Sequence, residues 1–295
     1  MFRFAKDTSI GLETYDCRYG RMHVLSSDTV IGRSLRLYGE WAEHELSILR
    51  SFVVPGTTVI DVGAHIGTHT LPLSVWVQNG RVIAIEPQPV ISSILRDNCV
   101  QNERLNVQVI NAICGSEIGS FDFRLKCGEH QNLGAISFAR THNHIWRKPF
   151  ILFTRLTNPK IVTMPMIMLD QFCSHEPVSL IKIDIEGMEF EALLGASKLL
   201  AHHRPVVYFE QNDTTKLPHT YDYLVGAGYR LLWLETHPFN KKNFRGVKEN
   251  IWWRTETGII AVPQETPMLN SLTEVQRNDQ NPPHLLNARA GIEVN

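Results

Sequence analysis

The stretch that decides the fold is Val59-Ile60-Asp61-Val62-Gly63-Ala64-His65-Ile66-Gly67-Thr68-His69-Thr70, followed by Val82-Ile83-Ala84-Ile85-Glu86. A β-branched run ends in an acidic residue and a glycine-containing turn, a helical pattern follows, and a second apolar run ends in Glu86. This order is typical of a βαβ unit that holds an adenosine. The glycines let the backbone approach a ligand closely, and a carboxylate at the second strand tip can accept both hydroxyl hydrogens of a ribose. The sequence therefore predicts a nucleoside site in which Glu86 binds the ribose.

The turn departs from the dinucleotide fingerprint, which disfavours a nicotinamide oxidoreductase. His65 stands where a second glycine would let a pyrophosphate approach the helix N-terminus. S-adenosylmethionine has a ribose and an adenine but no phosphate, so it tolerates a bulkier turn. We therefore expect S-adenosylmethionine as the cofactor, and the alternative is a purely structural strand-to-helix connection.

The chain alternates short apolar runs with helical patterns from residue 58 onward. Most of these runs are apolar throughout, as strands covered on both faces should be. This alternation predicts a doubly wound α/β sheet. The expected strands lie near 58–62, 81–85, 107–111, 180–184, 205–210, 229–234 and 258–262, and the expected helices near 68–77, 90–101, 188–201 and 219–227.

Length and composition favour one catalytic domain in a soluble protein. The 295 residues, 43% of them apolar, can bury one large core. A formal net charge of -1 gives no global basic field, so we expect no nucleic-acid partner. Five cysteines without a C-x-x-C pair argue against a disulfide framework or zinc cluster, which favours a reducing cytoplasm. No signal peptide or membrane-spanning run is visible, so we expect no membrane partner; the oligomeric state stays open, with a homodimer as one option.

The chain divides into three expected parts. Residues 1–35 form a small antiparallel lead-in marked by turn residues, and residues 36–263 form the catalytic domain. The polar segments 126–160 and 235–253 interrupt the pattern of the domain, and connections of this length are uncommon unless functional. We expect both to form a cap at the sheet edge that selects the acceptor. Residues 264–295 are poor in large apolar side chains, and we expect them to be loosely ordered.

A second group of acidic residues lies at another expected strand tip, in Lys182-Ile183-Asp184-Ile185-Glu186-Gly187-Met188-Glu189. Ligands of open α/β sheets bind outside the carboxyl ends of the strands, so Asp61, Glu86, Asp184, Glu186 and Glu210 should share one edge. Glu189 and Glu191 have a plainer explanation, because negative charge is favoured near a helix N-terminus. Asp184 and Glu186 precede that helix, and we interpret them as functional.

These motifs together resemble one family. They are Asp61-Val62-Gly63-Ala64, Ile66-Gly67, His69-Thr70, Glu86-Pro87-Gln88, the segment from Lys182 to Glu189, and Arg204-Pro205-Val206-Val207-Tyr208-Phe209-Glu210. Over about residues 35–263 the chain resembles the FkbM family of S-adenosylmethionine-dependent methyltransferases. Tyr38-Gly39-Glu40-Trp41 also resembles the family's Gly-Glu segment. The resemblance implies the class I methyltransferase (Rossmann-like) fold, a seven-stranded mostly parallel sheet with an antiparallel last strand. It also implies O-methylation of hydroxyls on sugars or secondary metabolites.

The resemblance further implies where the cofactor binds. It places Asp61, Gly63 and Gly67 beside the methionine moiety, Glu86 on the ribose, Asn111 and Ala112 at the adenine edge, and Asp184 at the amino or sulfonium end. His65 replaces the Asn that family members commonly carry, and we count it among the expected cofactor contacts. A hydroxyl acceptor also needs a general base within hydrogen-bond reach. The candidates are Glu186, which we favour, Glu210, and one of the cap histidines His142, His144 or His237.

Three alternatives stay open. Asp184 and Glu186 could bind Mg²⁺ or Ca²⁺. The chain lacks the second Asp-Asn pair of catechol-type methyltransferases, although Glu210-Gln211-Asn212-Asp213 lies in a comparable place. We therefore expect no metal. An N-methyltransferase acting on a nucleobase or peptide amine would carry an Asn/Asp-Pro-Pro-aromatic segment where this chain has Asp184-Ile185-Glu186-Gly187. A non-catalytic module that binds S-adenosylmethionine would keep Asp61, Glu86 and Asp184 equally well.

Overall fold

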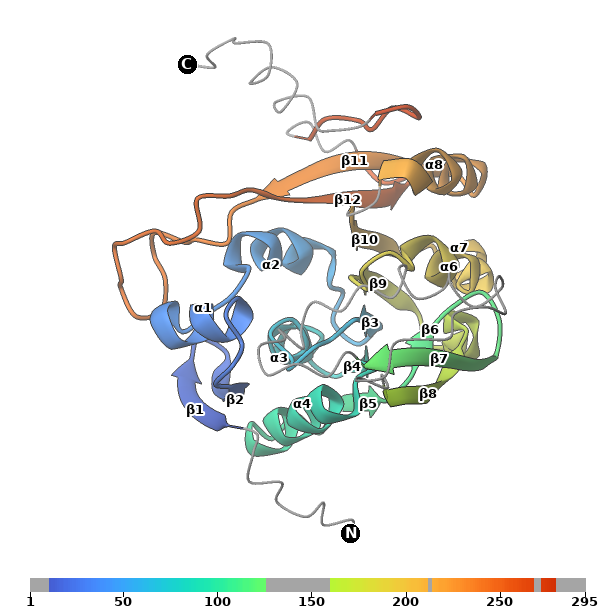
Figure 1. The fold of residues 1–295 in the computed structure, drawn as a ribbon. Helices are drawn as coiled ribbons and strands as arrows, with labels where there is room; N and C mark the ends of the chain where they lie inside the picture. Colours follow the sequence, from blue (N-terminus) through green and yellow to red (C-terminus); the bar gives the residue numbers. More distant parts are fainter. Residues whose placement is uncertain (1–10, 126–159, 212–213, 268–271, 280–295) are drawn as a thin grey trace, which may run out of the picture.

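A seven-stranded sheet forms the centre of the computed structural model, which describes residues 11–125, 160–211, 214–267 and 272–279 (Figure 1). The strand order is β11-β12-β10-β9-β3-β4-β5. Their bounds are β3 Thr58–Val62, β4 Arg81–Ile85, β5 Val107–Ile110, β9 Val178–Ile183, β10 Val206–Glu210, β11 Tyr229–Thr236 and β12 Glu256–Pro263. Strands β3, β4, β5, β9 and β10 run parallel, and β12 runs antiparallel to both β10 and β11. The predicted fold, a mostly parallel seven-stranded sheet with an antiparallel last strand, is confirmed.

The central strands are buried on both faces. All five residues of β3 are buried. Because side chains alternate along a strand, Ile60 and Val62 pack into one apolar cluster and Val59 into another. Asp61 lies opposite Lys182 in the register of β3 and β9, so two charged side chains meet inside the sheet layer. That pair supports the edge of the sheet where the strands end.

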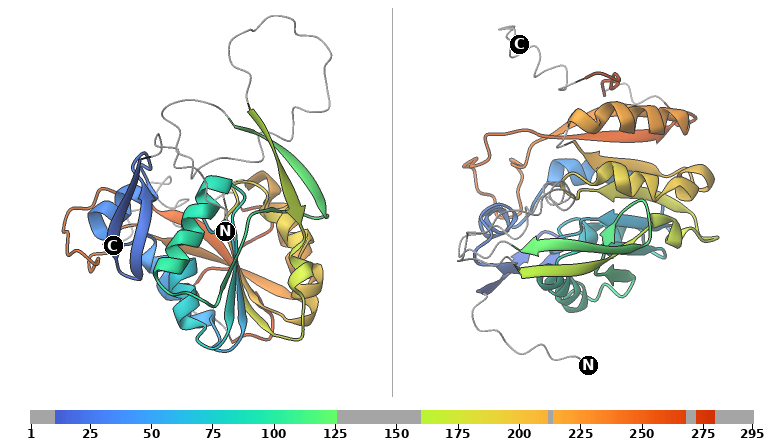
Figure 2. Two further views of the ribbon diagram at one scale, coloured as in Figure 1. Left: turned by 90° about the horizontal axis from the view of Figure 1, so that it is seen from below. Right: turned by 45° about the vertical axis from the view of Figure 1, so that its right-hand side comes forward.

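Helices cover both faces of the sheet (Figure 2). Residues of α2, α3 and α4 pack into the clusters on one face, and residues of α6, α7 and α8 pack on the other. Their bounds are α2 Glu43–Leu49, α3 Thr70–Trp76, α4 Pro89–Gln101, α6 Glu189–Leu194, α7 Ser197–His202 and α8 Leu217–Gly226, with short 3-10 turns η1 Arg50–Phe52, η2 Leu169–Phe172 and η3 Thr214–Lys216. None of the helices described combines the length and apolar character needed to cross a bilayer.

The N-terminal residues form a hairpin followed by a helix. Strands β1 Leu12–Cys17 and β2 Gly20–Leu25 pair antiparallel, and α1 spans Ile31–Tyr38. The expected lead-in had no helix, so α1 is a difference from the sequence analysis. The hairpin stands beside α4 (Figure 2), where Asn98 accepts a hydrogen bond from the backbone N–H of His23 at 2.6 Å and donates to its carbonyl oxygen at 3.1 Å. The hairpin is therefore fixed to the main domain.

A second, three-stranded sheet was not expected. It consists of β6 Ile113–Cys114, β7 Gly119–Leu125 and β8 Lys160–Ile167 in the order β6-β8-β7. Strands β7 and β8 pair antiparallel from Gly119 opposite Met166 to Leu125 opposite Lys160. The expected cap 126–160 lies between these two strands and, apart from Lys160, falls outside the described residues.

The other expected cap and part of the polar tail pack against the domain. Segment 235–253 lies along the N-terminal region, where the Tyr38 hydroxyl donates to the carbonyl oxygen of Glu249 at 2.8 Å. The tail contacts β11: the carbonyl oxygen of Thr273 accepts a hydrogen bond from the backbone N–H of Trp233 at 2.8 Å, and Glu274 forms an antiparallel bridge with Leu232. Residues 272–279 are thus attached to β11. Val275 of this segment is 2% exposed and packs into the same apolar cluster as Leu231 and Trp233.

Candidate active site

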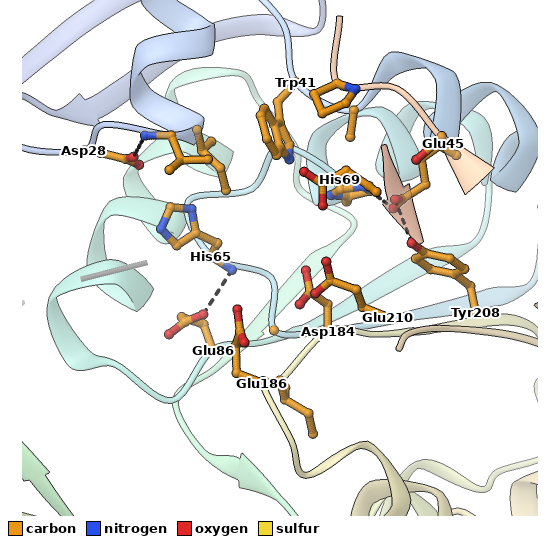
Figure 3. Close-up of a pocket in the computed structure, with 18 of the residues that line it drawn as sticks. Asp28, Trp41, Glu45, His65, His69, Glu86, Asp184, Glu186, Tyr208 and Glu210 are labelled. Atoms are coloured by element: carbon orange, nitrogen blue, oxygen red, sulfur yellow. Dashed lines mark hydrogen bonds and ion pairs between the residues drawn. The ribbon is translucent and has the colours of Figure 1, made fainter. Parts of the chain in front are cut away.

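A cavity of about 460 Å³ opens at the carboxyl ends of β3, β4, β9 and β10 (Figure 3). Its volume is in the range of small-molecule sites. The N-terminal region and the segment before β12 complete its walls. The lining residues used below are Asp28, Trp41, Glu45, Gly63, His65, His69, Glu86, Asp184, Glu186, Tyr208, Glu210, Pro238 and Arg254. Six of the predicted site residues are among them: Gly63, His65, Glu86, Asp184, Glu186 and Glu210.

Gly63 lets the turn after β3 pass directly beside the end of β9. Its φ is +78°, a conformation that glycine adopts at low cost. A Cβ atom at this position would lie 1.8 Å from the carbonyl oxygen of Asp184. The glycine therefore brings the two strand ends together, and any larger residue would separate them.

Glu86 is held in place by the backbone and retains room for a ligand. Its Oε2 accepts a hydrogen bond from the His65 N–H at 3.0 Å, and its Oε1 accepts one from the Gln88 N–H at 2.8 Å. Each carboxylate oxygen has two lone pairs, so each can accept one further hydrogen bond. Burial raises the pKa of Glu86 to about 7, against the opposing effect of the two backbone donors. This fixed carboxylate can bind a pair of neighbouring hydroxyls.

Asp61 lies beneath the cavity and does not line it. Its side chain is 0% exposed, its Oδ2 accepts a hydrogen bond from Thr70 Oγ1 at 2.7 Å, and its Oδ1 lies 3.4 Å from Lys182 Nζ. Lys182 Nζ also lies 3.4 Å from Asp184 Oδ2 and donates to the carbonyl oxygen of Gly63 at 3.2 Å. Asp61 thus belongs to an internal ion pair that supports Gly63 and Asp184, and its expected contact with a methionine moiety stays a prediction.

Asp184, Glu186 and Glu210, here called the acid trio, converge on the cavity floor. Each offers an oxygen within 4.8 Å of the others. Burial raises the pKa of Asp184, but Lys182 and the hydrogen bond with Glu210 together outweigh it, and its pKa is lowered. Burial, followed by the charge of Asp184, raises the pKa of Glu186 to about 7. Near neutral pH Asp184 is therefore a permanent charge, whereas Glu186 can exchange a proton.

The opposite wall contains a hydrogen-bonded group that the sequence did not predict. His69 Nε2 lies 2.8 Å from Glu45 Oε1, and the Tyr208 hydroxyl donates to Glu45 Oε2 at 2.8 Å. All three side chains are buried and line the cavity. His69 and Tyr208 lie within the motifs 59–70 and 204–210, and their place in these motifs was the sequence feature that could have indicated them. Glu45 comes from α2, where no sequence pattern points to it.

Of the remaining predicted residues, Asn111, Ala112 and Gly67 lie just outside the cavity. Asn111 donates from Nδ2 to the carbonyl oxygens of Glu86 and Pro87, both at 2.8 Å. Ala112 lines a separate apolar pocket of about 10 Å³, and Gly67, with φ +99°, packs near Leu95. His237 is exposed and stacks on His44, with ring centroids 6.0 Å apart, so the structure does not bring it to the cavity. His142 and His144 lie outside the described residues.

Several solved methyltransferase structures are similar to this chain. The methyltransferase FkbM of Methylobacillus flagellatus KT matches with 18% identity and a TM-score of 0.44, covering 70% of this chain. This chain spans only 43% of the length of that protein. An S-adenosylmethionine-dependent O-methyltransferase of Thermotoga maritima matches with 13% identity and a TM-score of 0.46, covering 87% of this chain and 79% of its own. A putative RNA methyltransferase of Pyrococcus horikoshii matches with 13% identity and a TM-score of 0.39, covering 75% and 80%.

The comparison with curated proteins found no match. The family model described as the methyltransferase FkbM domain matches residues 61–231. These residues include β3, β4, β9 and β10, which end at the cavity. The match covers more than half of the chain and confirms the resemblance seen in the motifs. The chain belongs to the FkbM methyltransferase family.

Proposed function

We propose that this chain is an S-adenosylmethionine-dependent methyltransferase that methylates a hydroxyl oxygen of a small molecule, such as a sugar or a natural-product intermediate. One observation carries the proposal. A fixed carboxylate suited to a ribose, Glu86, and a carboxyl group that can exchange a proton near neutral pH, Glu186, line the same cavity. A cofactor site and an acid–base group therefore lie within one small-molecule volume.

The residues present fit the cofactor. Both oxygens of Glu86 can accept ribose hydroxyl hydrogens. Ile85 and Pro87 beside it form an apolar surface with Ala112, Ile113 and Met188, against which a purine edge can pack. The acid trio and Glu45 give the cavity a negative lining that suits a cationic sulfonium.

The chemistry divides between the cofactor and the chain. When bound, S-adenosylmethionine supplies an electrophilic methyl group. The walls of the cavity orient the acceptor hydroxyl for in-line attack and exclude water. Glu186 accepts the hydroxyl proton as general base, because its raised pKa matches neutral pH. Asp184 stays ionised and holds the charge that raises the pKa of Glu186.

The acceptor side is formed by the N-terminal region and the segment before β12. Trp41, Pro238 and Arg254 line the cavity there, and Trp41 packs edge-on against Trp252 with ring centroids 6.0 Å apart. An aromatic ring, a guanidinium and several carboxylates suit a polar, hydroxylated acceptor.

Incubation with methyl-labelled S-adenosylmethionine and a panel of sugars and hydroxylated natural products tests the reaction. The proposal requires label on an acceptor oxygen, and transfer to an amine alone would replace it with N-methylation.

Glu86→Ala should weaken binding of S-adenosylhomocysteine. Loss of charge-assisted hydrogen bonds to the ribose costs about 1.5–3 kcal/mol, which is roughly a 10- to 150-fold rise in Kd. Isothermal titration calorimetry measures this change. Glu117→Ala, at an exposed position, is the matched control and should bind like the wild type. Affinity of the Glu86 variant within about twofold of wild type would mean that the ribose lies elsewhere.

Replacing residues 126–159 by a two-residue Asn-Gly turn should abolish turnover and leave cofactor binding intact. The replacement is feasible because Leu125 and Lys160 are direct antiparallel partners in β7 and β8, the arrangement that a two-residue hairpin connects. We expect this polar segment to select the acceptor. The two readouts are calorimetry with S-adenosylhomocysteine and turnover on an accepted substrate. Unchanged turnover would show that the segment does not select the acceptor.

A further inference from the structure

His65 is a buried side chain whose ring nitrogens have no hydrogen-bond partner among the described residues. It is 9% exposed, and neither Nδ1 nor Nε2 makes a hydrogen bond. Its backbone also adopts a φ of +49°, which is uncommon for a residue with a side chain. An unsatisfied buried polar group costs free energy and calls for an explanation. Because His65 lines the cavity, a ligand that hydrogen-bonds the ring would provide one.

Asp28 lines the same cavity and belongs to the N-terminal region. It is 5% exposed, and its Oδ1 accepts a hydrogen bond from the Val30 N–H at 2.9 Å. Its Oδ2 makes no hydrogen bond with the residues described. Figure 3 shows Asp28 and His65 on the same side of the cavity as Glu86. Burial lowers the pKa of His65, and the charge of Asp28 opposes that shift, so the imidazole and the carboxylate act on each other.

One buried amide fixes the elements that carry these two side chains. Asn98, 0% exposed, exchanges hydrogen bonds with the backbone of His23 in β2 and donates to the carbonyl oxygen of Ile66 at 2.8 Å. Ile66 follows His65 directly, and β2 leads into the turn that contains Asp28. Gly32 in α1 adds to this packing, because a Cβ there would lie 2.8 Å from Asp28 Cβ. The pair is therefore held in a set geometry before any ligand binds.

The chemistry of this pair suits a zwitterion. A carboxylate accepts hydrogen bonds from an ammonium group, and an imidazole N–H donates to a carboxylate. The apolar pocket beside Ile85 and Pro87 offers neither group. With the ribose on Glu86 and the purine packed against the apolar residues around that pocket, the amino-acid end of the cofactor is the remaining polar part of the molecule.

We propose that Asp28 and His65 bind the amino-acid end of S-adenosylmethionine, with Asp28 on the ammonium group and His65 on the carboxylate. The inference rests on the proposed function. Asp28 lies outside residues 61–231, which match the family model. The N-terminal hairpin and its turn are therefore part of the cofactor site.

Two ligands that differ in this end test the proposal by calorimetry. S-adenosylhomocysteine carries the amino acid, and 5′-methylthioadenosine lacks it. His65→Gly, which suits the positive φ, and Asp28→Asn should each raise the Kd of S-adenosylhomocysteine at least about tenfold and leave that of methylthioadenosine within about twofold. Glu86→Ala should weaken both ligands, and Asp16→Asn, at an exposed position, should weaken neither.

The outcomes separate the inference from the proposed function. Unchanged affinity of both variants for S-adenosylhomocysteine, or equal weakening of the two ligands, would overturn the inference. A wild-type protein that binds neither ligand would overturn the proposed function itself. If His65→Gly does not fold, as judged by circular dichroism, Asp28→Asn decides the question alone.

Discussion

Glu186→Gln is expected to lower kcat at least about a hundredfold, because general-base assistance typically contributes 10²–10⁴ in rate. Glutamine keeps the size of the side chain and cannot accept the proton. The affinity for S-adenosylhomocysteine should stay close to that of the wild type, since this ligand lacks the positive sulfonium charge that the acid trio would face. The rate of S-adenosylhomocysteine release with an accepted substrate, at saturating S-adenosylmethionine, measures the effect.

The pH profile gives a second check on Glu186. A base works in its ionised form, and burial with the charge of Asp184 raises the pKa of Glu186 to about 7. The kcat of the wild type should therefore fall as the pH drops below about 7 and level off above it, and the Gln variant should lose this dependence. EDTA should change nothing. Activity lost in EDTA and restored by Mg²⁺ would make the acid trio a metal site, and an unimpaired Gln variant would move the base to Glu210 or to His69.

Lys182→Met is expected to lower the free energy of unfolding by about 3–5 kcal/mol, the range for removing one partner of a buried ion pair. Lys182 is 2% exposed and lies 3.4 Å from both Asp61 and Asp184. Without it, Asp61 is left as an uncompensated charge inside the sheet layer. The carbonyl oxygen of Gly63 also loses its side-chain donor. Urea unfolding followed by circular dichroism measures the loss.

The matched control is Lys216→Met. Lys216 also pairs with a carboxylate, Glu191, at 3.0 Å, but the side chains of this pair are 32% and 35% exposed. Solvent screening should limit the loss there to about 1 kcal/mol or less. Adding Asp61→Asn to Lys182→Met should recover part of the stability, because it removes the unpaired charge. Equal losses in the two single variants would show that burial of the Lys182 pair has no special energetic weight.

The seven strands of the main sheet could be predicted because their signal is strong. Strands covered on both faces read as continuous apolar runs, and β3 and β4 were expected within the bounds that the structure gives them. The expected helix at 188–201 is two helices, α6 and α7, because the chain breaks between Leu194 and Ser197. Strand β7 was missed although Phe121, Phe123 and Leu125 alternate with polar residues, a clear strand pattern.

The site residues at the carboxyl ends of strands could be predicted from the sequence. Topology alone places Glu86, Asp184, Glu186 and Glu210 at one edge, since parallel strands end together. Asp61 also lies near a strand end. Side chains alternate between the two faces of a strand, and the Asp61 side chain lies on the face where it meets Lys182. Asp28 and Glu45 reach the cavity only through tertiary packing, 33 and 16 residues before Asp61. Contacts of that kind leave no periodic pattern in the sequence.

The most direct test of the central claim is a crystal structure of the chain with S-adenosylhomocysteine. We expect the ribose hydroxyls on Glu86, the purine toward Ala112 and Met188, and the sulfur facing the acid trio. We also expect the amino-acid end between Asp28 and His65. Crystals grown at saturating ligand that show the ribose away from Glu86, or no ligand in this cavity, would contradict this arrangement.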